Sequence, residues 1–117
     1  MDLAVALDTD DLDDQALLRA AMDRGAFAAW GLEVSLAILD ADEAVAATLD
    51  GRADVAITAR GPVIQALAAG APLAVLGLVG AWAIVMHERT FFERTPAIYA
   101  FMAVIGPGYG RLLFEGV

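Results

Sequence analysis

The sequence has 117 residues, which fits one domain, and it carries a net charge of −9 at neutral pH. All seven of its basic residues are arginine, so it lacks the basic surface that nucleic acids and anionic membranes require, and we expect neither as a partner. The absence of cysteine excludes a disulfide framework, a thiol nucleophile and a thiolate metal site.

The predicted elements alternate between strand and helix. In chain order, we predict a strand at 3–7, a helix that Asp13 or Asp14 caps and Gly25 ends, a strand at 32–39, a helix at 40–51, a strand at 53–57, a helix at 61–70, strands at 73–79 and 81–86, and a helix from Thr95. The 61–70 helix is predicted to turn Ile64, Leu67 and Ala68 inward. The last helix carries an apolar stripe and is predicted to break at 106–110, which is rich in glycine and contains a proline.

Strands that alternate with short helices pair in parallel, because a parallel neighbour needs a crossover that a helix supplies. The sequence therefore predicts an α/β fold, in three α-β-α layers, with a mainly parallel sheet of about five strands. Ligands of such sheets bind beyond the carboxyl ends of the strands. The loops after residues 7, 39, 57 and 79 are therefore the predicted site.

Apolar residues make up 60% of the chain, against roughly 45–50% in an average soluble domain. One small domain does not readily bury this excess, so we expect an interface with a second copy or with a larger protein. No apolar run reaches the roughly 20 residues that cross a membrane, and the acidic amino end differs from a signal peptide. We therefore expect a cytoplasmic protein without a membrane span.

Four short motifs follow one another between residues 3 and 86. They are Gly25-Ala-Phe27, Gly31-Leu-Glu-Val34, Gly51-Arg-Ala-Asp-Val55 and Ile64-Gln-Ala-Leu-Ala-Ala-Gly-Ala-Pro72. Together they resemble the solute-binding proteins of the nitrate, sulfonate and thiamine-precursor ABC transporters. This resemblance implies one lobe of a type II solute-binding-protein fold.

The tail extends the resemblance. Residues 91–101 are similar to the late helix of that family, which in full-length members follows a second lobe. Here only a few residues separate this helix from the first-lobe motifs. We therefore expect a single lobe over 1–117, with a βα core at 3–86 and a returning C-terminal helical segment at 91–117.

The resemblance also implies a ligand surface at the strand ends. Its residues are Asp8, Thr9, Asp10, Asp40, Thr58, Arg60, Gly61 and Trp82. Thr58, Arg60 and the helix start beside them suit an anion or a polar head group, because helix starts present free N–H groups and arginine pairs with carboxylate, sulfonate or phosphate. Trp82 suits stacking on a planar ring. The alternative for each is structural: a cap, a solvated charge or a packed ring.

The acidic run at 8–14 has further interpretations. Asp-x-Asp after a strand resembles haloacid-dehalogenase-type phosphotransferases, but these also need a lysine, and the chain has none. The run also resembles the calcium-binding start of nucleoside hydrolases, but it is shorter and lacks their proline–glycine pair. Its oxygens suit calcium or magnesium, yet the glycine of a calcium loop is missing. We expect a solvated helix cap, and neither a metal nor a cofactor.

Catalysis by the chain alone is not expected. His87 is the single histidine, and Ser35, the single serine, lies within a predicted strand. We therefore expect a non-catalytic module for a small anionic or heteroaromatic molecule, acting as an oligomer or with a covering partner that its apolar surface and C-terminal helix contact. The alternative is an accessory subunit of a multiprotein complex that has lost ligand binding.

Overall fold

The computed structural model describes residues 1–79, 81–86 and 94–114. Its elements are β1 (Asp2–Asp8), α1 (Leu12–Asp23), the 3-10 helix η1 (Ala28–Trp30), β2 (Glu33–Leu39), α2 (Ala41–Leu49), β3 (Val55–Thr58), α3 (Arg60–Ala68), β4 (Leu73–Val79), β5 (Ala81–Met86) and α5 (Thr95–Phe114). Every strand predicted from the sequence is present, with ends that differ by at most two residues. The α/β prediction is confirmed.

The five strands form one sheet in the order β2-β1-β3-β5-β4. β1 pairs in parallel with β2 and with β3, whereas β5 lies antiparallel between β3 and β4. Four strands thus point the same way and only β5 runs against them. The sheet is mixed, because the short connection after β4 sends the chain straight back as a hairpin instead of through a crossover helix.

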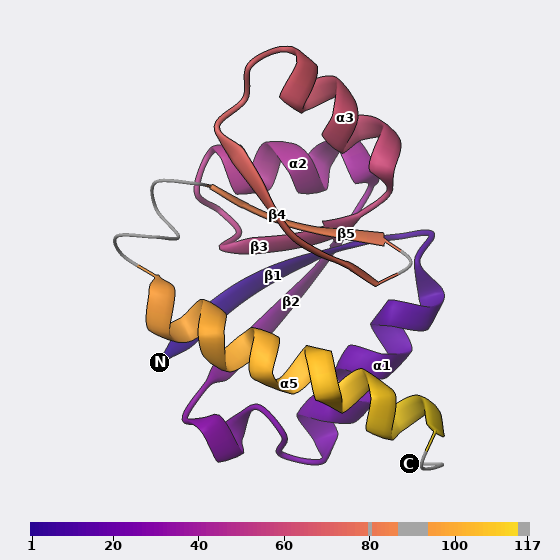
Figure 1. Cartoon of the computed structure of the whole chain (residues 1–117), viewed down its shortest axis with the longest axis vertical. Helices are drawn as coiled ribbons and strands as arrows, with labels where there is room; N and C mark the ends of the chain where they lie inside the picture. The colour runs from indigo at the N-terminus through magenta and orange to yellow at the C-terminus, as the bar shows by residue number, and fades with distance from the viewer. Residues whose placement is uncertain (80, 87–93, 115–117) are drawn as a thin grey trace.

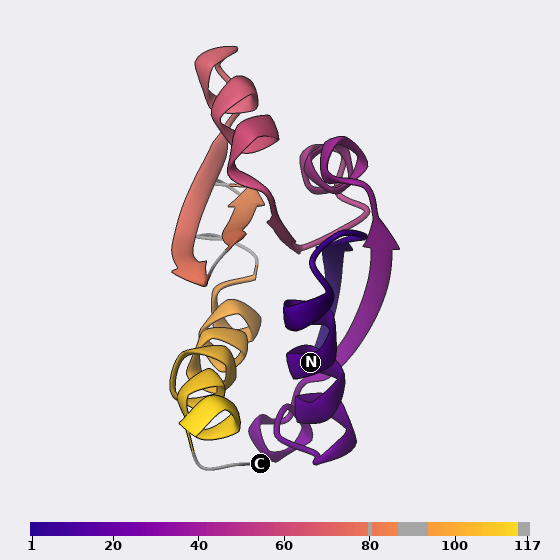
Figure 2. The ribbon, with the colours of Figure 1, turned by 90° about the vertical axis from the view of Figure 1, so that its right-hand side faces the viewer.

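Helices cover both faces of the sheet, so the fold has three layers. In Figures 1 and 2, α2 and α3 lie above the strands and α1 and α5 lie below them. Leu7 and Ile57 pack below with Leu18 of α1 and Phe101 of α5, and Ala6 and Ala56 pack above with Val63 of α3. This division follows from the period-two alternation of side chains along a strand.

Local signals explain where α2 begins and ends. The Asp40 carboxylate accepts from the Glu43 N–H, with Oδ1 and N 2.8 Å apart, and so satisfies a free donor at the helix start. Gly51 follows the helix with φ of 84°, a conformation that costs glycine little. In α1 the cap is Asp11, whose side chain accepts from the Asp14 N–H. The prediction of Asp13 or Asp14 as the cap was wrong, because both lie inside the first turn.

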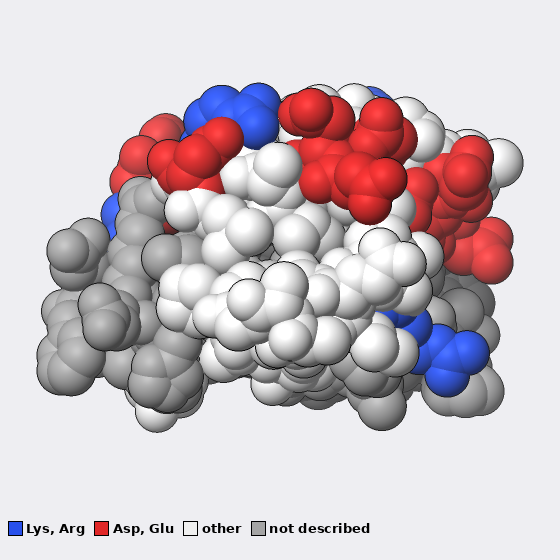
Figure 3. All heavy atoms as spheres, turned by 90° about the horizontal axis from the view of Figure 1, so that it is seen from above, with Lys and Arg blue, Asp and Glu red and all other residues white. Residues whose placement is uncertain are grey.

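The prediction for the inward face of α3 was wrong. Ile64 is 52% exposed and Leu67 is 38% exposed, whereas Val63 is fully buried against the sheet. Figure 3 looks down on this helical layer and shows uncharged atoms across its middle and acidic side chains along one border. A nine-residue helix with apolar residues on several sides does not fix its own rotation.

The last helix also differs from the prediction. It continues through 106–110, where the sequence predicted a break. Its apolar stripe is buried, with Ile98, Phe101 and Ile105 at most 4% exposed. Packing of this stripe stabilises the helix before the segment, and a helix that has already formed extends more easily than a new one begins. Among the described helices, none is long and apolar enough to cross a membrane.

Candidate functional site

The carboxyl ends of three strands meet in one row. Asp8 of β1 lies opposite Leu39 of β2, and because Leu7 lies opposite Ile57, Asp8 is also beside Thr58 of β3. Thr58 in turn pairs with Trp82 of β5. The chain leaves β1 toward α1, below the sheet, and leaves β3 toward α3, above it. Neighbouring strands whose connections diverge in this way form the crevice in which α/β sheets bind ligands.

Asp8 lies at the centre of this row of strand ends. It is 6% exposed, and its alternation with Leu7 puts its side chain on the upper face, toward α3. Oδ1 accepts from the Asp10 N–H at 3.0 Å, and Oδ2 accepts from the Ala59 N–H at 3.4 Å. Ala59 is the residue before α3, where no side chain caps the helix. The carboxylate therefore occupies part of the anion site that the sequence predicted at this helix start.

Thr58 is fully buried on the same face as Asp8, and its Oγ1 has no hydrogen-bond partner. The sequence offered two roles for this residue, helix cap and ligand group. The cap is wrong, since Ala59 holds the cap position without a side-chain bond. A buried hydroxyl without a partner costs free energy, and such a group in a native protein calls for an explanation, for example a bound water, ion or ligand.

The loop from β1 to α1 is held by a residue that sequence reasoning missed. Gln15 donates from Nε2 to the Asp8 carbonyl at 2.9 Å and to the Thr9 carbonyl at 3.2 Å. The Thr9 N–H donates to the Leu39 carbonyl at 2.8 Å and so ties the loop to β2. The bond from Thr9 to Leu39 joins segments that are distant in the sequence, and such a bond leaves no signal in the local pattern. Together these bonds fix the loop that carries Asp10.

The other predicted site residues lie at the same edge of the sheet, and those whose exposure the structure describes are more exposed to solvent than Asp8 and Thr58. Thr9, Asp10, Arg60 and Gly61 are exposed, and a Cβ added at Gly61 would meet no atom within 4 Å. Asp40 is exposed as well and caps α2. For Trp82 the structure describes the backbone alone. The fold therefore brings the predicted strand ends together but does not enclose them.

Two cavities lie elsewhere on the molecule. The first, of about 520 Å³, borders the amino end of β2 and is lined by Asp2, Met22, Phe27, Ala28, Leu32, Glu33, Val34 and Ser35. The second, of about 300 Å³, lies between α2 and the strands β1 and β2. Neither includes a predicted ligand residue. Among the described residues, no group of three or more acidic or histidine side chains is arranged to hold a metal ion.

Comparisons with protein-family models and with curated proteins find no match to this sequence. Among solved structures, the periplasmic aliphatic sulphonate-binding protein SsuA from Escherichia coli is similar, with a TM-score of 0.51 and 21% identity. The match covers 63% of this chain and 24% of that one, so it concerns about a quarter of the neighbour. The similarity is one of fold. This chain has a solute-binding-like α/β fold, and its five-stranded sheet with helices on both faces is consistent with a single lobe.

Proposed function

We propose that this chain is a non-catalytic module of the nitrate, sulfonate and thiamine-precursor solute-binding type, which binds a small polar molecule beyond the carboxyl ends of β1, β2 and β3. The observation that carries the proposal is Thr58. Its hydroxyl is fully buried and unpartnered in the row that also contains Asp8. Because the hydroxyl is shielded from solvent, a ligand would reach it through a local opening of the strand-end loops, and a hydrogen bond there would recover the free energy that the isolated hydroxyl loses.

The ligand has a polar group that both donates and accepts. Asp8 supplies carboxylate oxygens, whereas Thr58, Arg60 and the N–H groups at the start of α3 supply donors. A strong anion such as a sulfonate would contact Arg60 but would also approach the Asp8 carboxylate. A heteroaromatic ring with an amino group suits the mixed set better. The described residues cover such a ligand from one side, so we also propose that a second surface covers it.

A thermal-shift screen tests this function. The probes are nitrate, methanesulfonate, taurine and an aminopyrimidine. The matched variants are Arg60→Ala at the site and Arg19→Ala at an exposed position of α1. A ligand at about 100 times its dissociation constant stabilises the fold by roughly 2.7 kcal/mol, which is readily seen as a higher melting temperature. Arg60→Ala is expected to reduce the shift by anionic probes and Arg19→Ala to leave it unchanged. If no probe raises the melting temperature, the binding function is rejected.

The second candidate, an accessory subunit without a ligand, is favoured by the exposed apolar residues of α3, Ile64 and Leu67. Exposed apolar side chains on one helix face are typical of an interface. The stripe of α5 does not serve this purpose, because it is buried within the fold. Light scattering of the chain and of the double variant Ile64→Lys, Leu67→Lys tests this candidate. An equal molar mass for both, at the monomer value, rejects self-association through α3.

A further inference from the structure

β2 has a free edge. It is the terminal strand of the sheet, and among the described strands only β1 pairs with it. The Glu33 N–H donates to the Met1 carbonyl and the Leu39 carbonyl accepts from Thr9, so both residues direct their backbone groups toward β1. Successive residues of a strand direct these groups to alternate sides. The N–H and C=O groups of Val34, Leu36 and Ile38 therefore point away from the sheet.

The edge lacks the usual protection against added strands. β2 contains neither proline nor glycine, and its register with β1 is unbroken from Asp2–Glu33 to Asp8–Leu39. Glu33, at its amino end, is its single charged residue. Natural edge strands are commonly interrupted by lysine, proline or a bulge, or are covered by another element. A regular seven-residue strand without these features is a template for one more strand.

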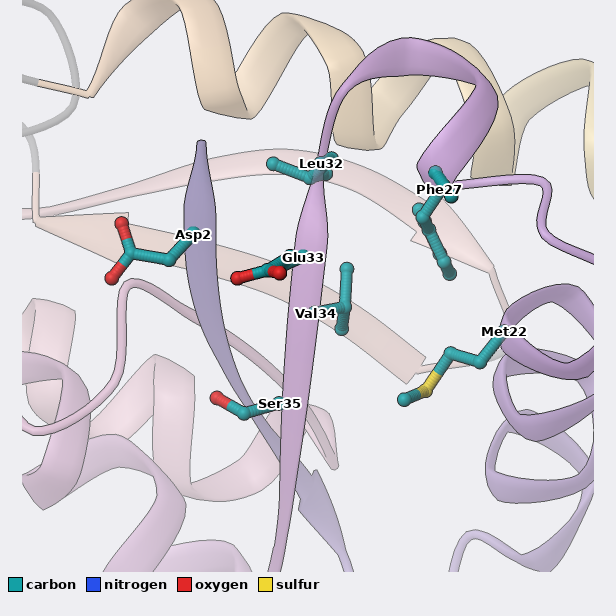
Figure 4. A pocket seen from close by; sticks show the side chains of 8 residues that line it. Asp2, Met22, Phe27, Leu32, Glu33, Val34 and Ser35 are labelled. Atoms are coloured by element: carbon teal, nitrogen blue, oxygen red, sulfur yellow. The ribbon is translucent and has the colours of Figure 1, made fainter.

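The 520 Å³ cavity lies along this edge. Figure 4 shows that Val34 points to the same side of β2 as Met22 and Phe27, whereas Glu33 and Ser35 point to the opposite side. A space lined by residues of both faces near the amino end of a terminal strand lies past the edge or the start of that strand. It is therefore placed to receive side chains from an added strand on both faces.

The two sides differ in chemistry. On the apolar side, Phe27 is 2% exposed and stacks on Phe101, with ring centroids 5.7 Å apart, so this wall is rigid. Met22 is 36% exposed and has a flexible thioether that adapts to different partners. On the other side, Glu33 lies opposite Asp2, whose carboxylate already pairs with Arg94 at 3.5 Å, so Glu33 is the carboxylate that is left to attract a partner's cation. This side favours basic side chains.

We propose that the β2 edge binds an extended segment of another protein, in which apolar and basic side chains alternate, as an added strand. Backbone hydrogen bonds to Val34, Leu36 and Ile38 supply affinity, and alternate side chains supply specificity. The apolar side chains of the added segment enter the part of the cavity beside Met22 and Phe27, and its basic side chains lie beside Glu33. A second copy of this chain is disfavoured as the occupant, because β2 has no basic residue and the chain carries a net charge of −9.

Fluorescence anisotropy tests the proposal with a short acetylated peptide of alternating lysine and valine. There are three control peptides. Two have the same sequence but carry N-methyl groups on every second residue, one peptide on the odd-numbered and the other on the even-numbered positions. The third alternates glutamate and valine. We expect binding of the lysine peptide, loss of binding when one of the two N-methyl sets is present, and no binding of the glutamate peptide. N-methylation removes the donors that strand addition needs.

Two protein variants with the same change in net charge separate the edge from long-range attraction. The Glu33→Lys variant is expected to bind the lysine peptide about tenfold more weakly and to bind the glutamate peptide instead. Asp42→Lys, at an exposed position of α2, is expected to change the affinity for the lysine peptide by less than about twofold. Equal losses in both variants, equal binding of all N-methylated peptides, or a dimer of the chain that Glu33→Lys dissociates would overturn the proposal.

Discussion

Arg94 and Asp54 form an ion pair across the amino end of the sheet, with Nη2 of Arg94 3.3 Å from Oδ2 of Asp54. The same Oδ2 accepts from the Ala4 N–H at 2.8 Å, and the Asp54 N–H donates to the Ala4 carbonyl. Arg94 also donates to the Asp2 carbonyl. One arginine before α5 thus ties the last helix to the starts of β1 and β3.

Replacement of Arg94 by methionine is expected to lower the free energy of unfolding by about 1–3 kcal/mol. The Asp54 side chain is 8% exposed, so its carboxylate would lose a charged partner in a mostly buried place. Urea unfolding followed by circular dichroism measures the change. Arg52→Met is the control, because its ion pairs with Asp50 and Glu43 are about half exposed and contribute little. Equal midpoints for Arg94→Met and the natural sequence would contradict the role of Arg94.

Phe101 is expected to be the most sensitive position of α5. It is fully buried, and its ring lies nearly parallel to that of Phe27, with an interplanar angle of 7°. Phe101→Ala should cost about 3–5 kcal/mol, a large share of the roughly 5–15 kcal/mol that stabilises a domain. Tyr99→Ala, at a position 72% exposed on the same helix, is the control and should change stability little. Similar losses for both variants would contradict this role of Phe101 packing, because alanine at either position raises the helix propensity of α5.

Thr58 and Thr48 give opposite expectations for the same substitution. Both are fully buried, but Thr48 donates from Oγ1 to the Ala44 carbonyl at 3.0 Å, whereas Thr58 has no partner. Thr58→Val should therefore raise the free energy of unfolding of the ligand-free protein by about 1 kcal/mol, and Thr48→Val should lower it by about 1 kcal/mol. Urea unfolding of the two variants measures both. A loss of stability in Thr58→Val would show that its hydroxyl is already satisfied.

The pKa of Asp50 is expected to respond to Arg52. The Arg52 guanidinium donates from Nε to both oxygens of Asp50, and its backbone N–H adds a third bond, so the pKa of that carboxyl lies below its ordinary value. A lowered folded-state pKa stabilises the fold above the ordinary value, and this contribution disappears as the pH falls through the lowered pKa. In Arg52→Gln, NMR titration should show a higher pKa for Asp50, although the backbone bond remains. An unchanged pKa would mean that the side-chain bond does not form in solution.

Much of the fold follows from short-range signals. The helix predicted at 40–51 agrees with α2, because the Asp40 cap and Gly51 each act on backbone groups within a few residues. The strand positions followed from apolar runs, and the row of strand ends followed from parallel pairing. The strand ends that the sequence predicted to share one edge therefore do lie side by side.

The sequence alone determined which segments are strands, where the helices between them lie, and at which edge the strand ends meet. The tertiary structure decided that β5 inserts between β3 and β4, that α3 turns Val63 rather than Ile64 inward, and that Asp8 accepts from Ala59, 51 positions away. These outcomes depend on which apolar surface is buried once every element competes for the same sheet. A local sequence pattern does not predict which surface is buried, because burial depends on residues that are distant in the sequence and adjacent only in the fold.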